Sequence, residues 1–221
     1  MTIISRLRSG EKEYPYVNPP FKMLSNKVVL HDCLPNCLTA LLSIYEVMYG
    51  FDLGEYSGNY EDLYSDLSEN LDNSSHRFFD SINSFLKDKN LGLTMRQGTF
   101  GNTNGELDHD LICKKFLNFN RFPIPIIAIV DEYMATHGTP LRGQHSILLL
   151  GHTQETYIVY DPNRRNLIYQ RAKTDLEYGW KPNEFQGLYL APEKQKIQKR
   201  STRIWFGIES LEQYLEWDEN E

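Results

Sequence analysis

Long hydrophobic runs and an excess of positive charge are both missing from this chain of 221 residues. No apolar stretch approaches the roughly 20 residues that a membrane-spanning helix requires, and the N-terminus lacks the pattern of a secretory signal. The formal net charge is −7, whereas phosphate-binding surfaces depend on clustered Lys and Arg. We therefore expect a soluble cytoplasmic protein that contacts neither a membrane nor nucleic acid.

Cysteine is also scarce in the chain. There are three cysteines, Cys33, Cys37 and Cys113, an odd number without the spacing of a disulfide framework. This usage is typical of a reducing compartment, where a free thiol is available for chemistry. Apolar residues make up 40% of the chain and aromatic residues 13%, which is enough for a core without disulfides or a metal. We expect a single domain over residues 1–221 and no cofactor.

The clearest helix signal follows Pro35. Apolar side chains recur at three- and four-residue spacings as far as Gly50, which is a typical C-terminal stop. Asp32 and Asn36 are capping-type residues, and Pro35 suits a first helical turn. Cys33 is therefore expected at the N-terminal turn of this helix, beside backbone N–H groups that have no partner within the helix.

The hydrophobic pattern changes along the chain from a helical to a strand-like one. Residues 1–30 are expected to form an extended arm, and the acidic, tyrosine-rich segment 51–75 a partly helical excursion on the surface. Further helices are expected over 75–89, 108–118 and 208–217. Strands are expected over 123–131, 145–151, 156–162 and 166–170. Helices first and strands later predict an α+β fold.

Cys33 has the position of a nucleophile, and His145 is the histidine that the strands can bring to it. A helix N-terminus lowers the pKa of a thiol and can donate to a developing oxyanion. A hairpin centred near residues 153 and 154 sets His145 opposite Pro162 and beside Asp161. Asp161 then orients the imidazole, as in a Cys–His–Asp triad. A slip of this register would separate His145 from Asp161.

The other cysteines and histidines have simpler expected roles. Cys37 and Cys113 lack the cap position and are expected to be small core residues. A zinc site that combines Cys33, Cys37 and His145 with His31 is disfavoured, because the C-x3-C pair has no second paired ligand motif. We therefore expect no metal. The remaining histidines are expected to be structural: His76, His109, His137 and His152.

Several segments resemble known papain-like enzymes. DCLPNCL before a helix, with QHSILLLG and TYIVYDP downstream, resembles the bacteriocin-leader peptidases. PIPIIAIVDEY, before the histidine strand, more closely resembles the N-terminal domain of the butirosin-biosynthesis acyltransferase, and the likeness covers about residues 25–170. This resemblance implies a papain-like fold with Cys33 as nucleophile, His145 as base and Asp161 as orienting acid. Asp131 and Tyr133 match a further feature of that family.

The chain departs from the family pattern near the expected nucleophile. Leu34 stands where a glycine is expected, and Lys27 stands where the leader peptidases have a glutamine six residues before their cysteine. Asn26 can supply an oxyanion-stabilising amide in its place. His31 is a second candidate, and the sequence does not decide between the two.

The resemblance implies acyl transfer through a thioacyl intermediate on Cys33. An amine acceptor would make the protein an acyltransferase of specialised-metabolite biosynthesis, such as that of antibiotics, whereas water would make it a peptidase or amidase. The closer likeness favours the acyltransferase. The expected partners are an acyl donor, including an acyl or peptidyl carrier protein that the basic segment 194–203 could dock, and an amine or peptide substrate. A non-catalytic binding module with an inert Cys33 is the remaining alternative.

Overall fold

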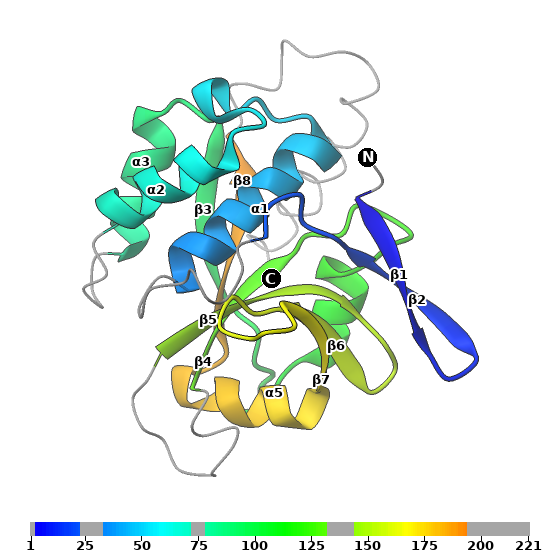
Figure 1. The fold of residues 1–221 in the computed structure, drawn as a ribbon. Coiled ribbons are helices and arrows are strands. Elements are labelled where there is room, and N and C mark those ends of the chain that lie inside the picture. The colour runs from blue at the N-terminus through cyan, green and yellow to red at the C-terminus, as the bar shows by residue number, and fades with distance from the viewer. Residues whose placement is uncertain (1–2, 23–32, 72–77, 132–143, 194–221) are drawn as a thin grey trace.

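Helices and an antiparallel sheet make up the protein, as the predicted α+β class requires (Figure 1). The structure is a computed structural model and describes residues 3–22, 33–71, 78–131 and 144–193. In chain order, its elements are β1 (Ile4–Ser9), β2 (Lys12–Val17), α1 (Cys33–Tyr49), the short 3-10 helix η2 (Gly54–Tyr56), α2 (Tyr60–Asn70), α3 (Phe78–Asp88), β3 (Leu93–Thr99), the π-helix η3 (Leu111–Phe116), β4 (Ile126–Asp131), β5 (Gln144–His152), β6 (Thr156–Tyr160), β7 (Ile168–Ala172), α5 (Lys173–Trp180), the 3-10 helix η4 (Lys181–Asn183) and β8 (Gln186–Pro192).

The sheet separates two hydrophobic cores. Its strand order is β1-β2-β5-β4-β8-β3, and β6 and β7 extend it from β5. Helices α1, α2 and α3 gather on one side and α5 lies on the other (Figure 1). Because successive side chains of a strand point to opposite faces, β5 sends Leu148 and Leu150 to the core with α1, and Ile147 and Leu149 to the core with α5. Strand β5 therefore contributes to both cores.

Helix α1 confirms the predicted helix after Pro35 and begins at Cys33. It is buried from Leu34 to Tyr45, so its polar side chains need partners inside the protein. Thr39 Oγ1 donates a hydrogen bond of 2.8 Å to the carbonyl of Pro35. The Tyr45 hydroxyl donates one of 2.6 Å to the carbonyl of Leu190 in β8. The first bond stays within α1, and the second fixes the helix against the sheet and thereby helps to position its first turn.

Other predicted helices and strands are present, but with different bounds or a different type of helix. Helix α3 and the strands β4 to β7 lie within or overlap the predicted ranges. The acidic segment contains η2 and α2, whose Leu63 and Leu67 are buried. The helix expected over 108–118 is instead largely the π-helix η3, in which the Leu117 N–H donates to the carbonyl of Ile112, five residues earlier, at 2.8 Å.

The N-terminal arm differs from the prediction, and four further elements were not predicted. Strands β1 and β2 form an antiparallel hairpin, and Tyr16 pairs with Gly151 of β5. A Cβ atom on Gly151 would lie 2.8 Å from the Pro15 carbonyl oxygen, so this close approach requires glycine. The unpredicted elements are β3, α5, η4 and β8. The predicted segments 194–203 and 208–217 lie outside the described residues.

Candidate active site

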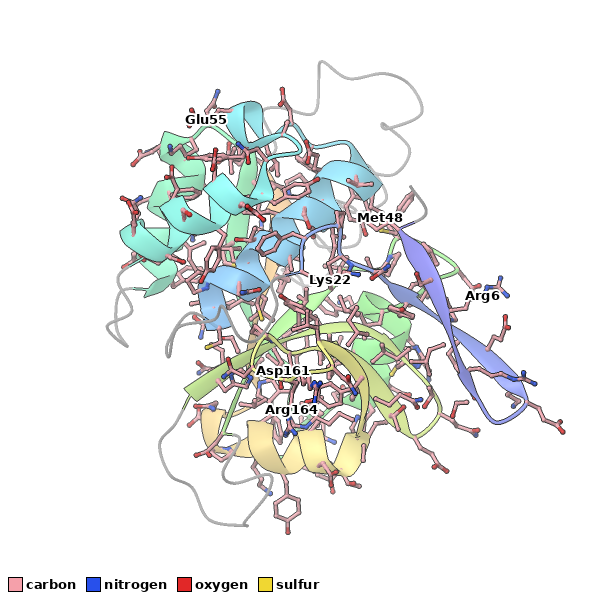
Figure 2. The ribbon with its side chains drawn as sticks, in the orientation of Figure 1. Arg6, Lys22, Met48, Glu55, Asp161 and Arg164 are labelled. Atoms are coloured by element: carbon pink, nitrogen blue, oxygen red, sulfur yellow. The ribbon has the colours of Figure 1, made fainter. Side chains whose placement is uncertain are left out.

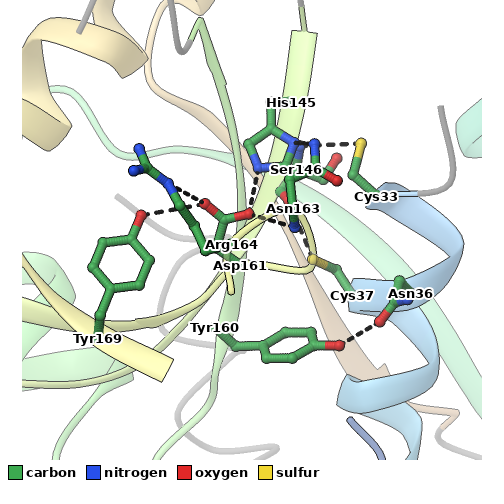
Figure 3. A network of polar contacts seen from close by, with 10 residues as sticks. All are labelled: Cys33, Asn36, Cys37, His145, Ser146, Tyr160, Asp161, Asn163, Arg164 and Tyr169. Carbon is green, nitrogen blue, oxygen red and sulfur yellow. Dashed lines mark hydrogen bonds and ion pairs between the residues drawn. The ribbon is translucent and has the colours of Figure 1, made fainter. Parts of the chain in front are cut away.

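The predicted nucleophile, base and acid lie together where α1 begins (Figure 3). His145 is the second residue of β5, and its Nε2 lies 2.8 Å from Oδ1 of Asp161, the residue that follows β6. The two side chains are only 7% and 1% exposed. Cys33 belongs to the first turn of α1, and its Sγ accepts a hydrogen bond of 3.4 Å from the backbone N–H of Ser146. Three separate parts of the chain thus meet at one site.

The hairpin that joins His145 to Asp161 has a different register from the predicted one. Next to the turn, His152 pairs with Tyr157 and Gly151 with Ile158, two residues away from their predicted partners. A bulge between Leu149 and Gly151 reduces this offset to one, so that Leu148 pairs with Tyr160 and not with Val159. The predicted register would have set Asp161 opposite Ser146, on the other face from His145. Continued one residue beyond β6, the observed register sets Asp161 opposite Ile147, which shares a face with His145. The predicted register is therefore wrong, and the slip joins the pair that it was expected to separate.

Asp161 is held as a carboxylate by its surroundings. Its Oδ1 accepts a second hydrogen bond, of 2.9 Å, from the Asn163 backbone N–H. Its Oδ2 accepts a hydrogen bond of 3.2 Å from the Tyr169 hydroxyl and lies 3.5 Å from Arg164 Nε. Figure 2 shows Asp161 and Arg164 side by side. Burial alone would raise the pKa of Asp161, but His145, the Asn163 N–H and the Arg164 charge outweigh it, so that the pKa is lowered.

His145 is stabilised in its protonated form. Burial alone would lower its pKa, but the interactions with Asp161 and Cys33 raise it from 6.5 to about 10. Since a carboxylate can only accept, the Nε2 that faces Asp161 carries a proton. The other ring nitrogen, Nδ1, is then available to the thiol. It also lies 3.3 Å from Nδ2 of Asn163.

The thiol of Cys33 is stabilised in its ionised form. Burial would raise its pKa, but the imidazole of His145 and the backbone and side chain of Ser146 together outweigh burial, and the pKa is lowered from its ordinary value. The position in the first turn of α1 acts in the same direction. A lowered thiol pKa beside a raised imidazole pKa describes a thiolate–imidazolium pair.

Cys37 and Cys113 differ from Cys33. Cys37 is fully buried, and its S–H donates a hydrogen bond of 3.3 Å to the carbonyl of Ser146. Burial, together with the charges of Cys33 and Asp161, raises the pKa of Cys37 well above the ordinary value. Burial also raises the pKa of Cys113. Both thiols are therefore disfavoured as nucleophiles. Cys37 is a core residue, as predicted, whereas Cys113 is only partly buried and packs against the core that contains α5.

Several residues of the site were not predicted. The backbone of Ser146 touches both Cys33 and Cys37, while Asn163, Arg164 and Tyr169 surround His145 and Asp161. Ser146, Asn163 and Arg164 lie within three residues of a predicted site residue. This closeness in sequence to a predicted site residue could have indicated that they belong to the site. Tyr169 comes from β7, and only the β6–β7 pairing brings it to the carboxylate.

Only some of the remaining predicted residues lie within the described part of the chain. Asn26, Lys27, His31 and Tyr133 fall outside the described residues, so the oxyanion-stabilising group stays a prediction. Asp131 ends β4, is 4% exposed and pairs with Gln144, next to His145. Within the described ranges, no three His, Cys, Asp or Glu side chains are grouped to hold a metal ion. No helix in the same ranges is long and apolar enough to cross a membrane.

A comparison with solved structures finds C39-type peptidase domains. The chain resembles a candidate C39-like peptidase from Bacillus anthracis, with a TM-score of 0.51 and 12% identity over 84% of this chain and 96% of that one. It is also similar to the peptidase domain of Streptococcus ComA, a bifunctional ABC transporter of a quorum-sensing pathway, with a TM-score of 0.44 and 17% identity over 76% of this chain and 96% of that one. For the same domain of Streptococcus mutans ComA, the TM-score is 0.38, with 16% identity over 78% and 100%.

These likenesses concern the fold. No protein-family model matches the chain, and no curated protein matches its sequence. The likeness to the Bacillus anthracis protein confirms the predicted papain-like α+β fold. At 12% identity it shows nothing beyond the fold. The resemblance to the butirosin-biosynthesis acyltransferase remains a prediction.

Proposed function

We propose that the protein is an enzyme that transfers acyl groups through a thioacyl intermediate on Cys33. The observation that carries this proposal is the pairing of a thiol of lowered pKa with a buried imidazole of raised pKa, which Asp161 orients. A buried core cysteine has no need of such partners, and the raised pKa of Cys37 in the same helix provides the contrast. An inert binding module would not require the ion pair.

Acylation of Cys33 follows from this geometry. The thiolate Sγ attacks the carbonyl carbon of the donor, a C–S bond forms, and negative charge develops on the carbonyl oxygen. Backbone N–H groups at the start of α1 are suitable donors to that oxygen. When the tetrahedral intermediate collapses, His145 gives its Nδ1 proton to the leaving nitrogen, oxygen or sulfur. A thioester on Cys33 and a neutral imidazole remain.

The second half of the reaction releases the acyl group. Neutral His145 takes a proton from the acceptor, whose oxygen or nitrogen attacks the thioester carbon, and the Cys33 thiolate leaves. Throughout both halves, Asp161 keeps Nε2 protonated and so directs Nδ1 toward the reacting atoms. The acceptor alone decides whether the product is a hydrolysed acid or a new amide.

Water is the acceptor that we propose first, which makes the protein a peptidase or amidase. The support is the likeness in fold to a candidate C39-like peptidase. An amine acceptor, and thus an acyltransferase acting on a carrier-bound or activated donor, is the second candidate. It rests on the segment PIPIIAIVDEY, whose Asp131 ends the strand that pairs with the histidine strand.

The alkylation rate of Cys33 as a function of pH tests the proposal. With iodoacetamide, we expect the rate to reach half its maximum at a pH below 8.5, near which an ordinary thiol titrates. In a His145→Ala variant, the half-maximal pH should move upward, because the group that lowers the pKa is gone. Cys33→Ser provides the background from other thiols. A wild-type thiol that titrates at about 8.5 or above would rule out the activated nucleophile.

Intact-mass analysis separates the two acceptors. The protein would be incubated with acyl thioesters in the presence and absence of amines, and separately with a peptide library. Release of free acid from the Cys33 adduct at the same rate with or without amine would support hydrolysis. Amine-dependent release with amide formation would support the acyltransferase instead.

A further inference from the structure

We propose that Asn163 is a positioning residue that contacts Nδ1 of His145 in both of its protonation states and, because it is a neutral amide and not a carboxylate, leaves His145 able to lose its proton for the second half of the reaction. This inference rests on the proposed function. Asn163 belongs neither to the predicted helix nor to the predicted triad. It lies in the exposed loop after Asp161, which would thereby take part in the reaction.

Residue 163 contacts both sides of the imidazole. Its side-chain Nδ2 lies 3.3 Å from His145 Nδ1. Its backbone N–H donates a hydrogen bond of 2.9 Å to Asp161 Oδ1, the same oxygen that lies 2.8 Å from His145 Nε2. The side chain thus acts on one ring nitrogen directly, while the backbone acts on the other through Asp161. Figure 3 shows Asp161 and Asn163 beside the imidazole ring of His145.

Exposure leaves the Asn163 side chain free to turn. Asn163 is exposed, whereas His145 is 7% exposed and is fixed by a buried carboxylate. A carboxamide carries a donor and an acceptor on the same carbon, and a half-turn exchanges them. The amide N–H can donate to Nδ1 of the neutral imidazole until the acceptor binds there, and the amide oxygen can accept from Nδ1–H of the imidazolium.

The reaction requires both protonation states in sequence. Before acylation, the imidazolium must hold the proton that it gives to the leaving group. After acylation, Cys33 is an uncharged thioester, and His145 must be neutral to take the proton of the acceptor. An amide at position 163 matches both states. A carboxylate at this position can only accept, so it would stabilise the imidazolium and oppose the second half.

Asn163→Asp is therefore the informative variant, and Asn166→Asp is its matched control. Asn166 is an exposed residue of the same loop, so this change adds the same charge to the loop. The probe is p-nitrophenyl acetate. Attack by Cys33 breaks the ester C–O bond and releases p-nitrophenolate as a burst, and water then converts the acetyl-enzyme to acetate. The burst reports acylation, and the steady state reports deacylation.

In Asn163→Asp, we expect the burst to persist and the pH profile of deacylation to move upward. At pH values below the His145 pKa of the acyl-enzyme, a shift of one pH unit would slow deacylation about tenfold. Asn166→Asp should follow the wild-type profile. An unchanged deacylation profile in Asn163→Asp, or an equal shift in Asn166→Asp, would overturn the proposal.

A second measurement does not depend on turnover. With Cys33 blocked by methyl methanethiosulfonate, the titration of His145 can be followed by NMR. The His145 pKa should rise in Asn163→Asp and stay at the wild-type value in Asn166→Asp. No difference would overturn the role of Asn163 even if the enzyme is active. A rise without any acetyl-enzyme in the wild type would instead leave the contact established and overturn the proposed function.

Discussion

The carboxylate of Asp161 accepts or pairs with four groups although its side chain is only 1% exposed. An ionised carboxylate is costly to bury unless its oxygens are satisfied, and here His145, Asn163, Tyr169 and Arg164 satisfy them. The charge on Asp161 in turn raises the pKa of His145, and His145 lowers the pKa of Cys33. The reactivity of the thiol thus depends on a residue that never touches it.

Replacing Asp161 by Asn should weaken the interactions that raise the pKa of His145 and, through it, lower the pKa of Cys33. The side chain keeps its shape but loses the charge, and an amide can present the wrong group to Nε2. We expect turnover to fall by about 10²- to 10⁴-fold. The half-maximal pH of Cys33 alkylation should rise. Steady-state rates and iodoacetamide kinetics provide the measurements.

Asp175→Asn is the matched control for this change. Asp175 lies in α5 and is exposed, so its loss removes the same charge from the protein without touching the site. It should retain wild-type turnover and alkylation kinetics. If Asp161→Asn also retained them, Asp161 would have no orienting role.

Among the secondary-structure elements, α1 and β6 are joined by one buried hydrogen bond close to the site. The Tyr160 hydroxyl donates to Asn36 Oδ1, and both residues are fully buried. Asn36 lies one turn after Cys33 in α1, and Tyr160 directly precedes Asp161. Within the described residues, Asn36 Nδ2 has no hydrogen-bond partner. This link connects the helix that carries Cys33 to the strand that leads to Asp161.

Removal of the Tyr160 hydroxyl should therefore loosen the packing of α1 on β6. In Tyr160→Phe, the Asn36 carboxamide oxygen would lose this partner in a buried environment, which costs about 1–3 kcal/mol. Urea denaturation should show a lower midpoint with an unchanged slope. Tyr178→Phe, at a side chain that is 61% exposed on α5, is the control and should leave the midpoint unchanged. Equal midpoints for Tyr160→Phe and wild type would contradict the role of this link.

Local sequence patterns were sufficient for some elements and insufficient for others. Helix α1 and strand β5 have strong apolar periodicity, because both are buried along most of their length. Strand β8 lies between β4 and β3, which are distant in sequence, so no neighbouring segment indicates its place. No local pattern marks the bulge in β5, which shifts the pairing of β5 with β6 by one residue on the side of His145. Pairing between distant strands and irregularities of register are properties of the folded sheet.

The same distinction applies to the site. Cys33 could be identified from its place at a helix start, and His145 and Asp161 from the ends of adjacent strands. Tyr169 reaches Asp161 only through the pairing of β6 with β7. Ser146 contacts Cys33 only because α1 packs on β5. Sequence reasoning therefore found groups with a chemical signature and missed partners whose role depends on packing.

Across the whole molecule, the pair of His145 and Asp161 links the site to global stability. The groups around it come from α1, β5, β7 and the segment after β6, so unfolding disperses them all. A group whose pKa differs between the folded and unfolded chain makes stability depend on pH. In the folded chain His145, with a pKa raised to about 10, stays protonated below that value, and in the unfolded chain it titrates near 6.5. Its charge is therefore the same in both states below about pH 5, where a comparison of the wild type with Asp161→Asn isolates the contribution of this carboxylate from that of the other acidic groups.

The stabilising contribution of Asp161 should disappear as the pH falls below about 3.8. Its folded pKa is lowered from 3.8, so above that value the carboxylate is ionised in both states and the full contribution is present. As the pH falls toward the folded pKa, the unfolded chain binds the proton first, and stability is lost. Urea midpoints of the wild type and Asp161→Asn should therefore differ most at pH 5 and converge at lower pH. Asp175→Asn should parallel the wild type, and a constant difference between wild type and Asp161→Asn at every pH would mean that this carboxylate does not titrate with unfolding.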